Sequence, residues 1–185
     1  MTAEPGMRAD ARRNRARIVA AAQEAFADEG LSVPLDEIAR RAGVGAGTVY
    51  RHFPTKEALF ETIVLGRVTA MGDRIRHWAA DPDPGPAFFT MIDVLAEQGV
   101  MKRDLTDALT SAGVDISDRL AEARDSIRAS MGTLLARAQA AGAVRPDVTT
   151  DDLSTLLSTV FLAAHQQGQG VPRRALAVIA DGLRA

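Results

Sequence analysis

The stretch LDEIARRAGVGAGTVYRHF, residues 35–53, decides the fold of this chain. A helix-turn-helix joins two short helices by a tight turn and needs a small residue where the helices cross. Ala39 supplies that residue, and Gly43, four positions later, accepts the left-handed backbone conformation of a sharp turn. Val49 follows six residues later and is placed to pack the second helix onto the first. The spacing predicts a helix-turn-helix whose second helix covers about residues 46–52.

Residues that typically start or end helices precede this motif. Apolar residues recur at helical spacing between Asp10 and Phe26, and Gly30 supplies the helix end that follows. A first helix is therefore expected, preceded by a flexible tail at residues 1–9. Pro34 suits the first position of the second helix, because its missing N–H would have no partner there.

The chain after the motif shows the same helical periodicity. Pro54 forces a break, and Thr55 is a good N-cap for a fourth helix whose apolar face continues to about Ala80. The proline-rich segment 81–86 cannot be helical throughout and predicts a loop. Alternating β-branched runs are scarce, so an all-α fold of about nine helices is predicted. The later helices are expected at about residues 86–98, 101–111, 116–141, 150–168 and 172–184.

At 185 residues the chain suits one folded domain of ordinary size, or a small domain attached to a larger one. Of the 185 residues, 46% are hydrophobic and 25% are charged, which provides enough apolar surface for a core. We expect an N-terminal three-helix helix-turn-helix domain at residues 10–56. A larger helical domain is expected at residues 57–185.

Several kinds of site and location are excluded. The chain has no cysteine, which rules out disulfides and thiolate metal sites, and its three histidines match no metal-binding spacing. It carries no catalytic motif, so no enzyme activity, cofactor or metal is expected. No apolar run approaches the roughly 20 residues that span a bilayer, and no apolar signal segment follows the N-terminal arginines. A soluble cytoplasmic protein with no membrane partner is therefore expected.

The second helix of the motif presents polar side chains outward, among them Thr48 and Arg51. Arginine can make a bidentate contact to guanine in the major groove, worth about 1–3 kcal/mol of discrimination. The motif is therefore interpreted as a DNA reader. Phe53 is expected in the core, whereas Tyr50 fits either a core position or a contact to phosphate.

Arginines cluster at the start of the first helix. The net charge is −2, yet five arginines lie at residues 8–17 against a single acid, Asp10. Local charge decides phosphate contacts, because screening limits them to about 8 Å at physiological salt. Contact to phosphate or to a minor groove is expected for Arg13, Arg15 and Arg17. The alternative is a soluble, frayed helix start; Arg40 and Arg41 are interpreted as a solvated helix face.

The sequence AFADEG followed by AxxAGVGxGTVYRHFPTKEALF resembles the DNA-binding domain of TetR-family transcription regulators, over about residues 11–66. The resemblance implies that Thr48 and Arg51 face base edges in the major groove. It also implies that Gly47 lets the backbone approach the DNA closely. The phosphate contacts that it implies are made by Tyr50, His52 and Lys56.

Two departures from the family pattern reduce the expected set of contacts. Gly45 and Ala46 stand where the family usually has Ser or Thr and then Lys. Leu35 lies where a Thr or Ser usually starts the second helix. Two hydroxyl groups that would contact phosphate are therefore missing.

Apolar stripes run along the last two predicted helices. In a monomer of this length little chain would be left to cover them, and the resemblance implies that two such helices from each subunit form a four-helix homodimer interface. Ordinary packing within the chain is the alternative. The expected interface residues are Leu153, Leu156, Leu157, Val160, Leu176, Ile179 and Leu183.

The resemblance also implies a ligand cavity in the larger domain, for which an apolar or amphipathic ligand fits the composition best. Aromatic and methionine side chains between the fourth and eighth helices are candidates to line it. Plain core packing is the alternative for each of them. The candidates are Trp78, Phe88, Met91, Met101 and Phe161, with His165 as a candidate polar contact.

The function that follows is a sequence-specific DNA-binding transcription regulator. The resemblance implies a homodimer that binds a palindromic double-stranded operator and acts as a repressor released by a small-molecule effector. One alternative is a DNA-binding regulator that responds to a protein partner. A second is an all-α enzyme with an incidental helix-turn-helix.

Overall fold

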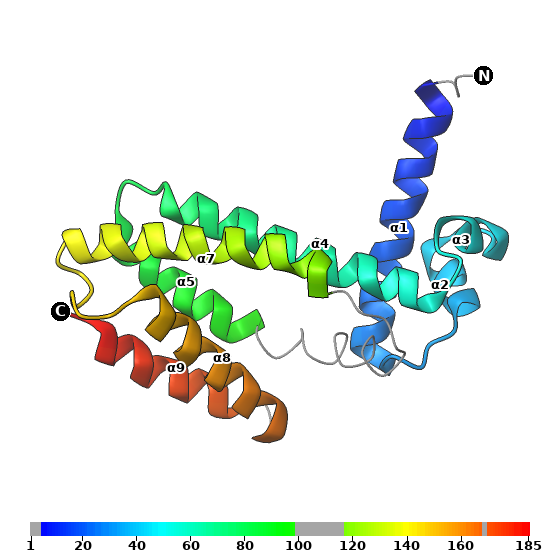
Figure 1. Cartoon of the computed structure of the whole chain (residues 1–185). Helices are drawn as coiled ribbons and strands as arrows, with labels where there is room; N and C mark the ends of the chain where they lie inside the picture. The colour runs from blue at the N-terminus through cyan, green and yellow to red at the C-terminus, as the bar shows by residue number, and fades with distance from the viewer. Residues whose placement is uncertain (1–4, 99–116, 168–169) are drawn as a thin grey trace. The chain divides into compact units, whose positions relative to one another are not determined.

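Every regular element is an α-helix in the residues that the computed structural model describes, 5–98, 117–167 and 170–185 (Figure 1). The all-α prediction is confirmed, and the helix expected at residues 101–111 lies outside the described residues. The helices are α1 (Pro5–Glu29), α2 (Leu35–Ala42), α3 (Ala46–His52), α4 (Lys56–Ala79), α5 (Pro84–Gln98), α7 (Ser117–Ala140), α8 (Thr150–Gln167) and α9 (Gly170–Leu183).

The first helix begins earlier than the sequence predicted. Residues 5–9 were expected in a flexible tail, but α1 starts at Pro5. Proline is tolerated in the first turn of a helix, and the alanines and arginines that follow favour helix. The helix ends as predicted, because Gly30 has a φ of +79°, which glycine adopts without steric cost.

The turn between α2 and α3 has the geometry that the sequence spacing predicted. Gly43 is left-handed, with φ +62° and ψ +38°. The Gly43 N–H donates to the Arg40 carbonyl at 3.2 Å, and the Val44 N–H donates to the Ala39 carbonyl at 3.1 Å. Pro34 serves as the N-cap of α2 and not as its first helical residue, a shift of one position.

The chain divides into two compact units, and α4 supplies residues to both. The described residues of the first unit are 5–65, so this unit extends beyond the predicted domain end at residue 56. Leu59 and Ile63 of α4 are fully buried, and the rings of Phe26 and Phe60 meet edge to face with 4.7 Å between their centroids. The first turns of α4 therefore complete the core under the helix-turn-helix.

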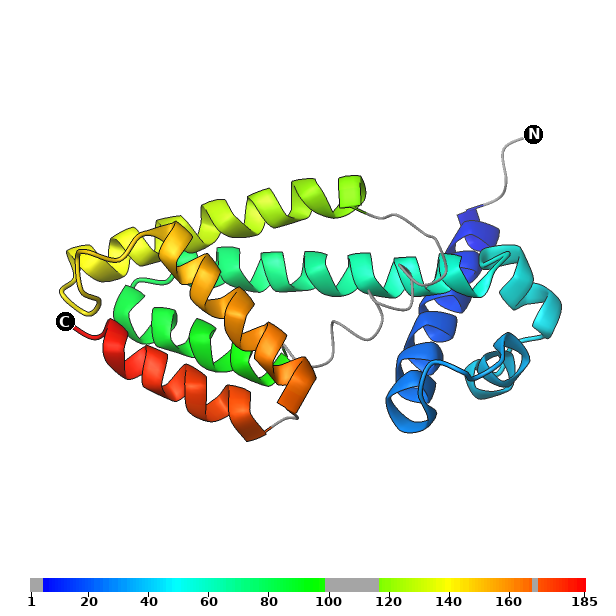
Figure 2. The ribbon, with the colours of Figure 1, turned by 60° about the horizontal axis from the view of Figure 1, so that its bottom comes forward.

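The second unit packs the rest of α4 with α5, α7, α8 and α9 around a separate apolar core. α5 and α9 lie side by side, as Figure 2 shows, and α8 also packs against α9. Phe88, Met91 and Ile92 of α5 and Leu134 of α7 are fully buried there.

The segment 81–86 is only partly the loop that was predicted. α5 begins at Pro84 and takes in Pro86, because prolines in a first helical turn lack only N–H groups that would have no partner in the helix. The Asp83 N–H donates to Asp81 Oδ1 at 2.9 Å and orders the turn before α5.

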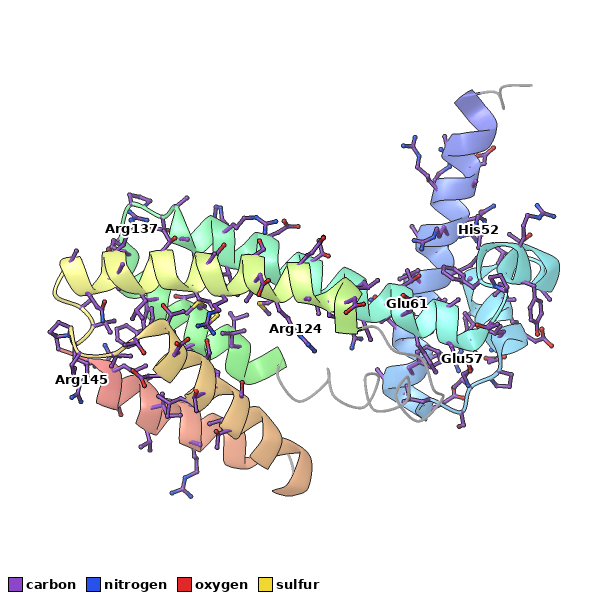
Figure 3. All side chains as sticks on the ribbon, in the orientation of Figure 1. His52, Glu57, Glu61, Arg124, Arg137 and Arg145 are labelled. Atoms are coloured by element: carbon purple, nitrogen blue, oxygen red, sulfur yellow. The ribbon has the colours of Figure 1, made fainter. Side chains whose placement is uncertain are left out.

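Side chains of α7 tie the ends of neighbouring helices together. Arg137, labelled in Figure 3, donates from Nη1 to the Ala79 carbonyl at the end of α4, at 2.6 Å. Gln139 donates from Nε2 to the Val148 carbonyl at 2.8 Å. The Arg145 N–H donates to the Leu183 carbonyl at 3.0 Å, which fastens the end of α9 to the loop after α7.

A reciprocal cap begins α8. The Asp152 N–H donates to Thr149 Oγ1 at 3.1 Å, and the Thr149 N–H donates to Asp152 Oδ2 at 2.9 Å. The hydrogen bond from the Thr149 hydroxyl lowers the pKa of Asp152.

We expect Thr149→Ala to cost about 1 kcal/mol of stability, measured by urea unfolding. Thr159→Ala, in the interior of the same helix, is the control and should change little.

Candidate nucleic-acid interface

The exposed face of α3 carries most of the predicted DNA contacts. Val49 is its single buried residue and is fully enclosed, which fixes which side of the helix faces outward. Gly47 and Arg51 are exposed, and Thr48 and His52 are half-buried. A Cβ at Gly47 would meet nothing within 4 Å, so no contact inside the protein requires glycine there.

The two aromatic residues of the motif have different surroundings. Phe53 is 1% exposed and belongs to the core, as expected. Tyr50 is 48% exposed, which decides against the core alternative and leaves its hydroxyl on the outer surface. His52, labelled in Figure 3 at the end of α3, has its ring tilted toward Phe53 with 6.4 Å between the centroids.

Lys56 starts α4 beside this surface. Its Nζ lies 5.9 Å from the Phe26 ring centroid and 5.6 Å from the Phe60 centroid, within cation–π range. Partial burial lowers the pKa of Lys56, while the charge of Glu57 raises it by less. Thr55 caps the helix as predicted, because its Oγ1 accepts the Ala58 N–H at 3.2 Å.

Both helices of the motif begin without a side-chain cap. Pro34 and Gly45 are the N-caps of α2 and α3, and neither makes a side-chain capping hydrogen bond. The first backbone N–H groups of α3 therefore have no side-chain acceptor from the cap.

Three arginines of α1 are engaged with the protein. Arg13 forms an ion pair with Asp10 one turn away. Arg15 lies over the Phe53 ring, 5.1 Å from its centroid, and donates to Thr62 Oγ1 at 3.1 Å. Arg17 donates from Nη2 to the Gly43 carbonyl at 3.1 Å. Sequence reasoning missed the last two contacts, because no local pattern reports a partner 26 or 47 positions away.

The arginines of α2 form ion pairs within the first unit. Arg40 and Arg41 both contact the carboxylate of Glu37 one turn earlier, and Arg41 also pairs with Glu29 at the end of α1. The hydrogen bond from Arg40 lowers the pKa of Glu37. Arg40 lies on a solvated face, as expected, whereas Arg41 links α2 to α1.

Two of the predicted ligand-pocket residues, Phe88 and Met91, border no water-sized cavity. Phe88 and Met91 are 0% exposed, and a side chain that lined a water-sized cavity would keep some accessible surface. Trp78 packs against the same core. Met101 and the side chains of Phe161 and His165 lie outside what the structure describes. An open groove of about 570 Å³ lies elsewhere, lined by Asp125, Arg128, Ala129, Gly132, Thr149, Thr150 and Asp151.

Most of the predicted dimer residues are covered within the chain itself. Leu156 is 37% exposed and Ile179 is partly buried against the core of the second unit. Val178, which the sequence analysis did not select, is 71% exposed. The remaining five are buried in the second unit: Leu153, Leu157, Val160, Leu176 and Leu183.

Two further features concern metals and membranes. Among the side chains that the structure describes, His, Asp and Glu form no group of three that could hold a metal ion. Within the same described residues, no helix combines the length and the apolar character needed to cross a membrane.

Both parts of the chain match known family models. The model described as "Bacterial regulatory proteins, tetR family" matches residues 18–63, which contain the helix-turn-helix. The model described as "Transcriptional regulator SbtR-like, C-terminal domain" matches residues 83–185.

Full-length relatives agree with these matches. A TetR transcription regulatory protein from Mycobacterium vanbaalenii has a crystal structure that is 44% identical in sequence. That alignment covers 97% of this chain and 99% of the other, with a TM-score of 0.78. The HTH-type transcriptional regulator UidR of Escherichia coli is 28% identical, over 97% of this chain and 93% of UidR.

A further solved relative is FadR from Thermus thermophilus, a TetR-family transcriptional repressor crystallised in complex with lauroyl-CoA. It is 25% identical over 91% of this chain and 90% of that chain, with a TM-score of 0.53. With both of its parts matched, this chain belongs to the TetR family and is a helix-turn-helix DNA-binding transcriptional regulator rather than an enzyme.

Proposed function

We propose that this regulator reads a palindromic operator through α3 and that a small molecule releases it. The exposed side of α3 carries the proposal, because burial of Val49 turns Tyr50 and Arg51 outward together. Thr48 and Arg51 contact base edges, and the backbone at Gly47 approaches the DNA closely. Phosphate contacts that set register and affinity come from Tyr50, His52, Lys56 and Arg13.

A homodimer would present its two α3 helices to successive major grooves, about 34–36 Å apart. Exposed apolar side chains on α8 and α9 support self-association, namely Leu156 and Val178. A two-fold interface uses the same patch on both subunits, so these side chains would meet their own copies or each other.

The two α3 helices of the dimer would lie at one spacing when the protein binds DNA and at another when it does not. Release would come from a ligand that binds the second form more tightly than the first. The continuous helix α4 supports this, because it contributes to the core of both units. The lauroyl-CoA bound by FadR supports an amphipathic ligand for this chain. The ligand-free protein is therefore proposed to bind the operator and repress transcription.

The experiment is footprinting on the DNA that flanks the gene of this regulator. A protected palindrome, lost when lauroyl-CoA or another acyl-CoA is added, would support the whole proposal. If no metabolite removes the protection but a protein from the same cells removes it, the effector is a protein partner and not a small molecule. If no DNA is protected even at low salt, the proposed operator reading is overturned.

Replacing Lys56 by alanine should weaken binding to every DNA sequence alike. Each phosphate contact contributes about 0.9 to the slope of log K against log[salt], and the variant should lose that amount per contact. Fluorescence anisotropy over a salt series measures it. Glu57→Gln, which removes a negative charge from the neighbouring position, is the control and should not reduce the slope. An unchanged slope in Lys56→Ala would contradict the phosphate contact.

A further inference from the structure

The reading helix α3 has few anchors of its own. It is seven residues long, well below the roughly 12–15 residues at which an isolated helix becomes marginally stable in water. Val49 is its only buried residue, and its N-cap Gly45 has no side chain to bond the first N–H groups. The segments that flank α3 must therefore hold its exposed face in place. These segments are the turn at Gly43 and the C-cap at Phe53.

Arg17 of α1 holds the first of these segments. Its Nη2 donates to the Gly43 carbonyl at 3.1 Å, across 26 positions of sequence. A Cβ at Gly43 would lie 2.6 Å from that Nη2, closer than two non-bonded atoms approach. Glycine at this position therefore serves the left-handed turn and also leaves room for the guanidinium group.

Arg15 of α1 holds the second segment. Its guanidinium lies over the ring of Phe53, 5.1 Å from the centroid. The same group donates to Thr62 Oγ1 at 3.1 Å, which fixes it between the end of α3 and the first turns of α4. Two arginines of one helix thus contact the protein on either side of α3.

We propose that Arg15 and Arg17 are positioning residues for base reading, which hold α3 from both ends and are not primarily phosphate contacts. The proposal rests on the operator reading proposed above, and it revises the role that the arginine cluster predicted for these two side chains. Arg13, whose ion pair with Asp10 touches neither flanking segment, keeps its proposed phosphate contact.

Salt dependence separates the two roles. A lost phosphate contact lowers the slope of log K against log[salt] by about 0.9 and weakens cognate and random DNA alike. A lost positioning contact removes no cation that neutralises a phosphate, so the salt slope stays the same. It weakens only the binding that depends on the alignment of α3 with base edges.

The test compares Arg17→Ala with Arg12→Ala, which removes the same charge from an exposed position on the same helix. The DNA probes are the duplex that wild-type protein selects from a randomised pool and a random duplex of equal length. For Arg17→Ala we expect about tenfold weaker binding to the selected duplex, which is about 1.4 kcal/mol. Its affinity for random DNA and its salt slope should not change. Arg12→Ala should leave the ratio of the two affinities unchanged.

A reduced salt slope, or an equal loss on both duplexes, in Arg17→Ala would overturn the positioning role. Arg17→Lys keeps the charge and serves where the alanine variant fails to fold. A phosphate contact predicts near wild-type binding for the lysine variant. Positioning by the guanidinium predicts a selective loss on the selected duplex, because lysine lacks the planar fork.

A measurement without DNA keeps this proposal separate from the operator reading. Hydrogen exchange of the α3 amides should accelerate in Arg17→Ala, while exchange in α5 and α7 should not change. Unchanged α3 exchange would overturn the positioning role even if wild-type protein binds DNA well. If wild-type protein prefers no duplex, the operator reading fails, and faster α3 exchange would still support the hold on α3.

Discussion

Arg51→Ala should remove the preference for one base pair in each half of the operator. The side chain is exposed on α3, on the surface opposite the buried Val49, and in the proposed complex it makes a bidentate contact to guanine. Such a contact is worth about 1–3 kcal/mol of discrimination, so the preferred base should lose about a 5- to 160-fold advantage. Affinities for duplexes that carry each base in turn at every operator position would measure this loss.

The matched control for this prediction is Arg40→Ala. Arg40 is an exposed arginine of the neighbouring helix α2, and its guanidinium pairs with Glu37. Its removal changes the charge by the same amount but should leave every base preference in place. A uniform drop at all positions in Arg51→Ala, with the base preferences unchanged, would sink the assigned base contact.

Phe53→Ala should unfold the first unit under mild conditions. The ring is 1% exposed and also carries the guanidinium of Arg15 on its face. Truncating a buried phenylalanine typically costs about 3–5 kcal/mol, because the apolar contacts are lost and a cavity remains. Urea unfolding followed by hydrogen exchange in residues 5–65 would measure the loss, together with the disappearance of DNA binding.

Tyr50→Ala is the control for the core substitution. Its side chain is 48% exposed, and surface substitutions usually change stability by no more than about 0.5 kcal/mol. We expect this variant to stay folded while its DNA affinity falls. Equal losses of stability in the two variants would contradict the different surroundings of the two rings.

Local punctuation could be predicted because it depends on one or two residues at a time. Gly30 and Gly43 both have positive φ, and each lies at the helix end where the sequence placed it. Thr55 caps α4 through its own hydroxyl group. The predicted start of the first helix was wrong, because a run of helix-forming residues after Pro5 extends α1 into the predicted tail.

Partners of long side chains could not be predicted in the same way. The arginines at residues 8–17 were interpreted by their charge, but Arg15 and Arg17 contact residues brought near only by folding. The apolar stripes on α8 and α9 were real, yet periodicity does not say what covers a stripe. Leu153 and Leu176 are covered by their own chain, whereas Leu156 is 37% exposed.

The sequence by itself determined the helix-turn-helix, because Ala39, Gly43 and Val49 act through spacing and local backbone preference. Only the tertiary structure decided how the reading helix is held. Val49 supplies its single buried contact, and the arginines of α1 meet its two flanking segments. The physical reason is the separation of the interacting residues along the sequence. A turn depends on residues a few positions apart, whereas the contacts of Arg15 and Arg17 depend on which helices pack together.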